Sequence, residues 1–364
     1  MDNFRIYLLI LYIMSILKII YTVVIIIVTV LMLSFIGLIV YALVSDYKPD
    51  EREIIAQPDK PSILKESLSI SFLTWNIGYA GLDKDMDFFY DGGTKVRTQE
   101  NNCRKNLAEI ENFLKKNDSV DFIILQEVDI KSKRSYKIDE YKSISEKLTG
   151  YNSFFAKNYD VFFVPSPLSN PMGKVISGIA TYSKYTPESS TRYSLPGDFG
   201  FPTQLFYLDR CFMVSRYKLM NGKELVLINT HNEAFDEGDI RKAQMEVLKG
   251  FIIKEYKSGN YIIAGGDWNQ CPPDFKPSFR GNQVNTSQMV MESDYLPTDW
   301  KSVFDPATPS NRSVVAAYDP TTTTTTVIDF FVLSPNIEAV SVKCHNLDFA
   351  NSDHNPVIMQ AKLK

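Results

Sequence analysis

The sequence places two chemically reactive side chains next to each other near its C-terminal end, at Asp353 and His354. A carboxylate binds hard metal ions, and an imidazole moves protons near neutral pH. The chain has only three histidines, and a second one, His231, ends an apolar run. Asp267 and Asn269 follow another apolar run in the same way. These scarce groups, each beside a predicted buried strand, indicate one shared site.

Three further polar residues occupy comparable positions. Asn76 and Glu127 each come directly after an apolar run, and Asp329 lies within one, between Ile328 and Phe330. An ionised carboxylate in an apolar strand is costly unless it is paired, so Asp329 requires a partner, for which a histidine is a good candidate. Ligands of α/β proteins bind at strand ends. The simpler alternatives are that Asn76 caps a turn and that Glu127 is a surface carboxylate.

The elements that must position these groups are strands and helices in alternation. Residues 68–75 and 121–126 have the composition of buried strands, and a helical repeat of apolar residues over 98–116 separates them. Asn221-Gly222 stands between two further strand patterns, which is typical of a hairpin with a type I′ turn. Together these patterns predict an α/β fold in which helices cover mixed sheets.

The first 45 residues differ in composition from the rest of the chain. Between Ile6 and Val44 the only charge is Lys18, and residues 19–44 are uncharged and mostly apolar. About 20 apolar residues suffice to cross a bilayer, and a helix facing water needs a polar stripe that this run lacks. We therefore expect residues 1–45 to be a membrane anchor that spans the membrane at 19–44.

The residues that flank this span indicate the side of the membrane. Basic residues precede it and acidic ones dominate after it, which favours a cytoplasmic N-terminus and an extracytoplasmic remainder. A second short pass through residues 6–17 would reverse this orientation. The apolar run is too long for a cleaved signal peptide. Residues 46–68 are polar and hold three prolines, so they are expected to link the anchor to a domain at 69–364.

Composition limits the class of protein. A hydrophobic content of 45% and a charged content of 23% are typical of a folded globular protein. The formal net charge of −4 disfavours a protein that grips long nucleic acid, which needs a basic surface. A solvated face is expected for most of a group of basic residues that could otherwise supply positive potential near the mouth of the site, namely Lys95, Arg97, Lys131, Lys133 and Arg134. The four cysteines form no Cys-x-x-Cys pair, which argues against a zinc ribbon and leaves disulfides open.

Taken together, the motifs resemble those of the endonuclease/exonuclease/phosphatase superfamily, which includes pancreatic-type deoxyribonuclease, abasic-site endonucleases, inositol-polyphosphate 5-phosphatases and neutral sphingomyelinases. The resemblance covers about residues 69–362 and rests on six motifs in order: Thr74-Trp75-Asn76, Leu125-Gln126-Glu127, Asn229-Thr230-His231, Gly266-Asp267-Trp268-Asn269, Ile328-Asp329-Phe330 and Ser352-Asp353-His354-Asn355-Pro356. Each motif is weak alone, but the ordered set is specific. The resemblance implies a four-layer α/β/β/α sandwich of two mixed sheets flanked by helices. In this chain, the apolar run at residues 19–44 predicts a transmembrane helix before that domain.

The resemblance implies a metal site. Glu127 would be the principal ligand of a divalent cation, usually Mg²⁺ with Mn²⁺ as the substitute, and Asn76 and Asp353 would lie beside it. Arg241 and Gln244 resemble the Arg-x-x-Gln element of the family and are expected to support the loop that precedes them.

The family resemblance also implies catalytic roles for the remaining site residues. Asp267 and Asn269 would orient and activate a water for attack on phosphorus. His354, held by Asp329, would act as a general base or a phosphate contact, and His231 would donate to a phosphoryl oxygen. The division of acid and base work among Asp267, His231 and His354 stays open.

We therefore expect a membrane-anchored, metal-dependent phosphoesterase that hydrolyses a phosphodiester by in-line attack of an activated water. Its partners would be the substrate and, through residues 19–44, the cell membrane, with no protein partner implied. A lipid headgroup suits the anchor best. An extracytoplasmic nuclease for DNA or RNA, and an inositol-phosphate or phosphomonoester phosphatase, are alternatives. A non-catalytic binding module is disfavoured, because every expected catalytic side chain is present.

Overall fold

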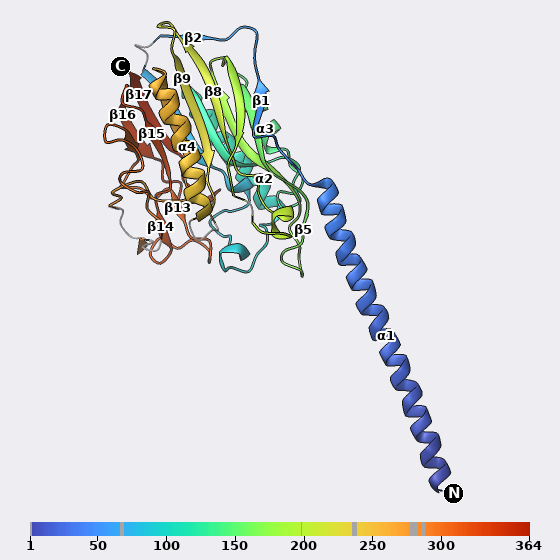
Figure 1. Cartoon of the computed structure of the whole chain (residues 1–364). Helices are drawn as coiled ribbons and strands as arrows, with labels where there is room; N and C mark the ends of the chain where they lie inside the picture. The colour runs from blue at the N-terminus through green and yellow to red at the C-terminus, as the bar shows by residue number, and fades with distance from the viewer. Residues whose placement is uncertain (1, 66–68, 198, 235–238, 277–282, 285–287) are drawn as a thin grey trace. The chain divides into compact units, whose positions relative to one another are not determined.

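In the computed structural model of the chain, the described residues are 2–65, 69–197, 199–234, 239–276, 283–284 and 288–364. The chain divides into two compact units, Met1–Asp46 and Tyr47–Lys364, and we call the second unit the sandwich domain (Figure 1). The first unit holds one helix, and the sandwich domain holds every strand of the described residues.

The first unit is the helix α1 (Asp2–Ser45). The stretch Asn3–Ser45 is long and apolar enough to cross a membrane, and its large apolar side chains are mostly exposed. A membrane span and an N-terminal signal sequence both have this composition. The helix is continuous, so residues 6–17 have no turn at which a separate second pass could begin.

The sandwich domain is built on two mixed β-sheets, of which the larger has eight strands. They are β1 (Arg52–Ala56), β2 (Ile63–Leu64), β7 (Ser189–Ser194), β8 (Cys211–Leu219), β9 (Glu224–His231), β10 (Tyr261–Asp267), β12 (Lys301–Val303) and β15 (Asp329–Leu333). The order is β1-β7-β8-β9-β10-β15-β12, with β2 paired to β8. The pairs β9/β10 and β2/β8 are parallel, and the other pairs of this sheet are antiparallel.

The smaller main sheet has six strands. They are β3 (Ser69–Asn76), β4 (Phe122–Asp129), β5 (Asn152–Val164), β6 (Gly173–Ser183), β16 (Ile337–Cys344) and β17 (Val357–Leu363). Their order is β16-β17-β3-β4-β6-β5, with β3 and β4 parallel. A separate small sheet in the order β11-β14-β13 consists of β11 (Gln283–Val284), β13 (Asn311–Arg312) and β14 (Thr324–Thr326).

Helices cover the outer faces of both main sheets (Figure 1). They are α2 (Glu100–Lys116), α3 (Glu140–Lys147) and α4 (Asp239–Lys257), and short 3₁₀ turns lie at Gly78–Ala80, Phe89–Asp91 and Thr203–Phe206. One apolar cluster packs α2 and α3 on the smaller sheet, a second packs α4 on the larger sheet, and a third fills the space between the sheets. The layers therefore follow the order α/β/β/α, which confirms the predicted fold class.

Each main sheet contains one pair of parallel neighbours joined by a helix, β3-α2-β4 in one and β9-α4-β10 in the other. In β4, Ile123 and Leu125 pack toward α2, whereas Phe122 and Ile124 pack into the space between the sheets. Both faces of this strand are buried, which explains its unbroken apolar run. Because parallel strands run the same way, their carboxyl ends lie at one edge of the sheet.

The segment 46–68, expected to be a polar linker, contributes two strands to the larger sheet. β1 pairs with β7, where Arg52 lies opposite Tyr193, and β2 pairs with β8. Just before β1, the carbonyls of Asp50 and Glu51 accept hydrogen bonds from the side chain and backbone of Ser194. The chain therefore joins the sandwich domain soon after α1 ends.

The four cysteines all belong to the described part of the chain and are free. Each thiol is buried: Cys103, Cys211, Cys271 and Cys344. Burial in apolar surroundings raises the pKa of each of the four thiols. The disulfides that the sequence left open are therefore not formed, and these thiols are poor nucleophiles.

Candidate active site

The eight predicted site residues meet at one edge of the two sheets. The smaller sheet and its connections supply Asn76, Glu127, Asp353 and His354. The larger sheet and its connections supply His231, Asp267, Asn269 and Asp329. Six of the eight line one cavity of about 340 Å³. The other two, Asn76 and Asp329, lie behind it and contact lining residues.

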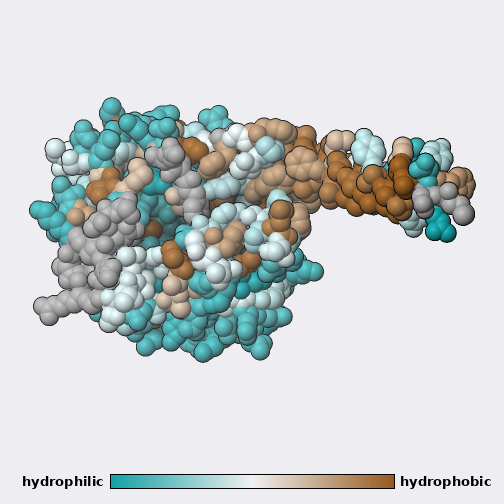
Figure 2. Space-filling model, turned by 90° about the horizontal axis from the view of Figure 1, so that it is seen from below, coloured by the Kyte–Doolittle hydropathy of each residue, from teal (hydrophilic) through white to brown (hydrophobic). Residues whose placement is uncertain are grey.

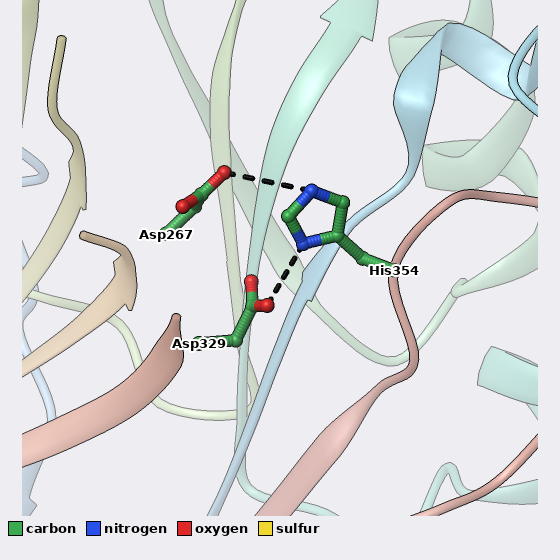
Figure 3. Close-up of side chains that lie close together, drawn as sticks. All are labelled: Asp267, Asp329 and His354. Carbon is green, nitrogen blue, oxygen red and sulfur yellow. Dashed lines mark hydrogen bonds and ion pairs between the residues drawn. The ribbon is translucent and has the colours of Figure 1, made fainter. Parts of the chain in front are cut away.

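Three buried side chains converge at the centre of this site (Figure 3). His354 Nδ1 lies 2.8 Å from Asp329 Oδ2, and His354 Nε2 lies 3.7 Å from Asp267 Oδ2. The carboxylate of Asp329 thus has the histidine partner that its place in an apolar strand requires. Although ligand atoms of the three residues lie within 4.8 Å of one another, the short contact with Asp329 gives His354 the geometry of an oriented acid–base group.

Carboxylates control the charge of His354. Burial of the ring opposes a positive charge, but Asp329, Asp353 and Asp267 outweigh burial and raise the pKa of His354 well above its usual value. His354 Nε2 also lies 3.0 Å from Asn311 Nδ2. An amide donates to the neutral ring and, turned over, accepts from the protonated ring. The imidazole therefore keeps a partner at both nitrogens in either charge state.

Asp267 is the centre of the polar network. Its Oδ2 accepts a hydrogen bond from Asn76 Nδ2 at 3.0 Å and lies 3.6 Å from His231 Nε2. Its Oδ1 accepts from the backbone N–H of Asn269 at 2.9 Å. Burial raises the pKa of Asp267, although the nearby His354 opposes this shift. A carboxylate with a raised pKa beside a cavity is suited to take a proton from a water molecule.

Glu127 and Asp353 place carboxylates in the same cavity. Glu127 lies at an irregularity in the pairing of β4 and has φ +53°, a distortion that redirects a side chain toward a site. Burial raises the pKa of Asp353 to about 7, and the charge of Glu127 adds to this against the opposing effect of His354. A divalent cation relieves repulsion between two carboxylates, so this pair of oxygen donors fits Mg²⁺.

Asn76 connects the two groups of side chains. Its Nδ2 donates to Glu127 Oε1 at 3.2 Å as well as to Asp267, and its Oδ1 accepts from the backbone N–H of Gly78 at 3.0 Å. The amide oxygen keeps a second lone pair for a cation. Gly78 has φ +51°, and a Cβ on it would lie 2.9 Å from Asp353 Oδ1, so a glycine is needed here.

His231 faces the same carboxylates as a neutral ring. Burial and the positive charge of Arg210 lower the pKa of His231 well below its usual value. Its Nε2 lies 3.9 Å from Glu127 Oε1 in addition to its approach to Asp267. Among the described residues, its Nδ1 has no hydrogen-bond partner. The Nε2 nitrogen is therefore the one placed to donate into the cavity.

The residues after His231 are held by α4, as expected from the Arg-x-x-Gln element. Arg241 donates to the carbonyls of Glu233, Ala234 and Asn269, at 2.6, 3.0 and 3.0 Å. Gln244 Oε1 accepts from the backbone N–H of Glu233 at 2.9 Å. These contacts join the loops after β9 and β10, so the two residues act as supports for the site.

Arg134 lies in the cavity wall and is an exception to the solvated face expected for most of these basic residues. It is buried, forms a 2.9 Å ion pair with Asp129, and its guanidinium lies 3.7 Å from the centre of the Tyr79 ring. No sequence pattern marked this burial, because the ionic partner of Arg134 lies five residues earlier in β4, where an apolar run gives no sign of a charge pair. Lys131 and Lys133 are exposed, as expected.

Sequence patterns also missed three other polar residues of the cavity wall, namely Asn311, Arg312 and Arg210. Arg210 forms a buried 3.2 Å ion pair with Glu233. Arg312 donates to backbone carbonyls of the neighbouring loops, including that of Asp83 at 2.6 Å. Asn311 and Arg312 form β13, which has only two residues and so no periodicity that could have marked it.

Solved structures share this fold at low sequence identity. An endonuclease/exonuclease/phosphatase from Beutenbergia cavernae is 16% identical with a TM-score of 0.54, over 81% of this chain and 72% of that one. The human Nocturnin catalytic domain with bound sulfate is 14% identical with a TM-score of 0.51, over 84% and 100%. ANGEL2, a 2′,3′-cyclic phosphatase, is 16% identical with a TM-score of 0.50, over 87% and 99%.

Comparison with curated protein sequences gives no match. The model of the Endonuclease/Exonuclease/phosphatase family, whose members are hydrolases of phosphoester bonds, matches residues 73–354. That range contains all eight predicted site residues and most of the sandwich domain. The chain therefore belongs to the Endonuclease/Exonuclease/phosphatase family.

Proposed function

We propose that the chain is a membrane-anchored, Mg²⁺-dependent phosphodiesterase, with its sandwich domain on the extracytoplasmic side of the cell membrane. The observation that carries the proposed chemistry is the arrangement around Asp267. An oriented Asp329–His354 pair lies on one side of it, and the carboxylates of Glu127 and Asp353 face the same cavity. Family membership supports phosphoester hydrolysis, and α1 supports the anchor.

Glu127 and Asp353, with the free lone pair of Asn76 Oδ1, would hold the divalent cation. These oxygen donors suit Mg²⁺ and also accept Mn²⁺. A cation bound there polarises the phosphoryl group and stabilises the leaving oxygen. Its positive charge would offset the charge of Glu127, which adds to the burial that raises the pKa of Asp353.

The remaining side chains would carry the proton transfers. Asp267 accepts a proton from the attacking water, which Asn269 helps to orient, while the water oxygen bonds to phosphorus and the opposite ester P–O bond breaks. His354, charged through its contact with Asp329, and His231, donating from Nε2, stabilise the negative charge that builds on the phosphoryl oxygens. The departing oxygen regains a proton from solvent.

The test is metal-dependent hydrolysis of bis-p-nitrophenyl phosphate by the full chain in detergent, with and without EDTA. We expect turnover that EDTA abolishes and Mg²⁺ restores. Glu127→Ala and His354→Ala should each lower kcat by about 10²-fold or more, the scale of a lost metal ligand or of a lost group that stabilises transition-state charge. The matched control is His345→Ala, because His345 packs on the Phe113 ring and lies outside the cavity lining. Absence of metal-dependent turnover would refute the proposal and favour a binding module.

The proposed orientation has a separate test. Protease added to intact cells should digest the sandwich domain if it lies outside the membrane. Protection of the domain until the cells are lysed would place it in the cytoplasm instead, without bearing on the chemistry.

A further inference from the structure

The chain enters the sandwich domain at the edge that carries the candidate active site. Arg52 of β1 lies opposite Tyr193 of β7, which lies opposite Phe212 of β8, which lies opposite Thr230 of β9. These residues form one cross-strand row, and Thr230 directly precedes the catalytic candidate His231. Neighbouring strands lie about 4.8 Å apart, so three spacings place Arg52 roughly 15 Å from Thr230.

The connection between α1 and this row is short. α1 ends at Ser45 and β1 begins at Arg52. An extended chain spans at most about 3.6 Å per residue, so this connection reaches no more than roughly 25 Å. The hairpin at Asn221-Gly222 lies at the other end of the strands, one length of β9 farther from Arg52. At about 3.3 Å per residue, that length is roughly another 25 Å. The short connection from α1 is therefore attached to a strand end at the same sheet edge as the site.

The loops around the cavity mouth carry exposed apolar side chains. They are Tyr90, Leu168, Phe201 and Val315. Tyr90 itself lines the cavity. The loops that hold Leu168, Phe201 and Val315 contribute the lining residues Met172, Leu208 and Val314, respectively. Figure 2 views the end of the sandwich that carries β13 and β14 in Figure 1, and apolar residues are interspersed there with polar ones. Exposed apolar side chains gathered on one face mark a surface that binds a protein or a membrane.

We propose that the cavity mouth, through Leu168, Phe201, Tyr90 and Val315, docks on the lipid bilayer that α1 crosses, and that the substrate is the phosphodiester headgroup of a lipid in that bilayer. This proposal rests on the proposed function and adds its substrate class. The anchor would hold the cavity at the surface where such headgroups are concentrated, and the apolar tips would align the mouth with them.

The cavity itself has the dimensions and lining for one headgroup. Its volume of about 340 Å³ is that of a site for a small organic molecule. The rings of Tyr79, Phe88 and Tyr159 contribute apolar wall next to the charged catalytic side chains. A net charge of −4 disfavours the binding of a long polyanion. A lipid that keeps its acyl chains in the bilayer needs to present only its headgroup to such a cavity.

The first test separates docking from tethering. A rigid helical insert of about 20 residues between Asp46 and Tyr47 would lift the domain by roughly 30 Å, whereas a Gly/Ser insert of equal length lets it reach the surface. Both full-length proteins are placed in nanodiscs of equal parts phosphatidylcholine and phosphatidylglycerol, and release of water-soluble headgroup phosphate is measured. We expect the rigid insert to lower lipid hydrolysis at least tenfold relative to the flexible insert, with equal rates on bis-p-nitrophenyl phosphate.

The second test places a fluorophore at a loop tip. All four natural cysteines are buried, so Leu168→Cys, Phe201→Cys and Met220→Cys can be labelled selectively in the full chain. Met220 is the matched control, because it is 64% exposed like Phe201 but lies in the hairpin at the opposite edge. Nitroxide-headgroup lipids in the nanodisc should quench the labels at positions 168 and 201, and leave the label at 220 unquenched.

The outcomes distinguish this inference from the proposed function. Equal quenching at all three positions, or equal lipid hydrolysis with both inserts, overturns the docking surface. Hydrolysis of bis-p-nitrophenyl phosphate without release of phosphate from either lipid overturns the substrate class and leaves the proposed function intact. Loss of metal-dependent hydrolysis of every ester would instead refute the proposed function, while the quenching pattern would still report docking.

Discussion

The contact between Asp329 and His354 is the single interaction on which the proposed chemistry depends most. Asp329→Asn keeps the shape of the side chain but removes a charge that raises the pKa of His354. We expect kcat to fall by about 10²–10³-fold, the scale of one lost group that stabilises transition-state charge, with little change in KM. Steady-state kinetics on bis-p-nitrophenyl phosphate with saturating Mg²⁺ measure both quantities.

A matched substitution shows whether this effect is specific. Asp348 is exposed in the turn before His354, where it contacts Asn346, so Asp348→Asn should leave kcat unchanged. A kcat for Asp329→Asn within threefold of the wild-type value would mean that His354 does not need its buried carboxylate.

A second buried acid, Glu140 at the start of α3, predicts how stability depends on pH. Burial raises the pKa of Glu140 well above its ordinary value, and the nearby Asp129 adds to this. The folded state therefore holds a proton that the unfolded state releases above about pH 4.5, so the contribution of Glu140 to stability falls as the pH rises. The free energy of unfolding of the Glu140→Gln variant should therefore exceed that of the wild type, and the difference should grow from pH 5 to pH 8.

Urea denaturation at several pH values measures this difference. Glu140 Oε2 accepts from the backbone N–H of Asp129 at 2.8 Å, and a glutamine oxygen can keep this contact. Glu146→Gln, an exposed change on the same helix, is the control. A destabilisation by Glu140→Gln that grows with pH would show that the buried group is ionised in the folded protein.

Residue types and their positions predicted which side chains lie together at the candidate site, but only where the residue was rare or out of place. The three histidines of the chain, and an acid inside an apolar strand at Asp329, were conspicuous. Arg210 and Asn311 were not, because polar residues in loops and in two-residue strands are common. Their contacts with Glu233 and His354 join segments far apart in the sequence, and no local pattern encodes such a pair.

Among the elements, the β9–β10 pair shows how closely the backbone must pack at the site. Gly266 has φ +143°, and a Cβ on it would lie 2.0 Å from the carbonyl oxygen of Thr230. Gly266→Ala must push the two strands apart beside His231 and Asp267. We expect it to lower the free energy of unfolding by more than about 2 kcal/mol, since backbone strain and a clash act together, and to lower kcat as well.

Gly222 provides the comparison for this change. It also has a positive φ, +79°, but a Cβ on it would meet nothing within 4 Å. Gly222→Ala should therefore show only the cost of the backbone conformation, about 1 kcal/mol, with kcat unchanged. If chemical denaturation gives equal losses for both variants, close strand packing at Gly266 is not the cause.

Strands with regular patterns were predictable, whereas local irregularities and short edge strands were not. The apolar runs of β3, β4, β9 and β10 and the presence of a hairpin at Asn221-Gly222 follow from composition. The positive φ of Glu127 does not, because an irregular pairing arises from fitting two strands together. The predicted type I′ turn was wrong, because that turn needs a positive φ at both central residues and only Gly222 has one. β1 was not predicted from composition, because its first residues, Arg52 and Glu53, are typical of a linker and its apolar residues are few.

At the scale of the whole molecule, truncation should separate the roles of the two units. Removal of residues 1–46 should release the sandwich domain from the membrane with near-wild-type hydrolysis of bis-p-nitrophenyl phosphate. Removal of residues 1–60 also deletes β1 and uncovers the edge of β7, so it should lower the urea midpoint and promote aggregation. Equal urea midpoints for the two truncated proteins would mean that β1 does not stabilise the domain.

The division of the site between the two sheets has a mechanical consequence. The oxygen donors proposed for the cation belong to one sheet, while His231, Asp267 and Asp329 belong to the other. A displacement of about 1 Å between reacting groups costs roughly 10²-fold in rate. The value of kcat would therefore depend on the relative position of the two sheets. A core substitution that shifts one sheet relative to the other would lower kcat strongly while every helix and strand remained folded.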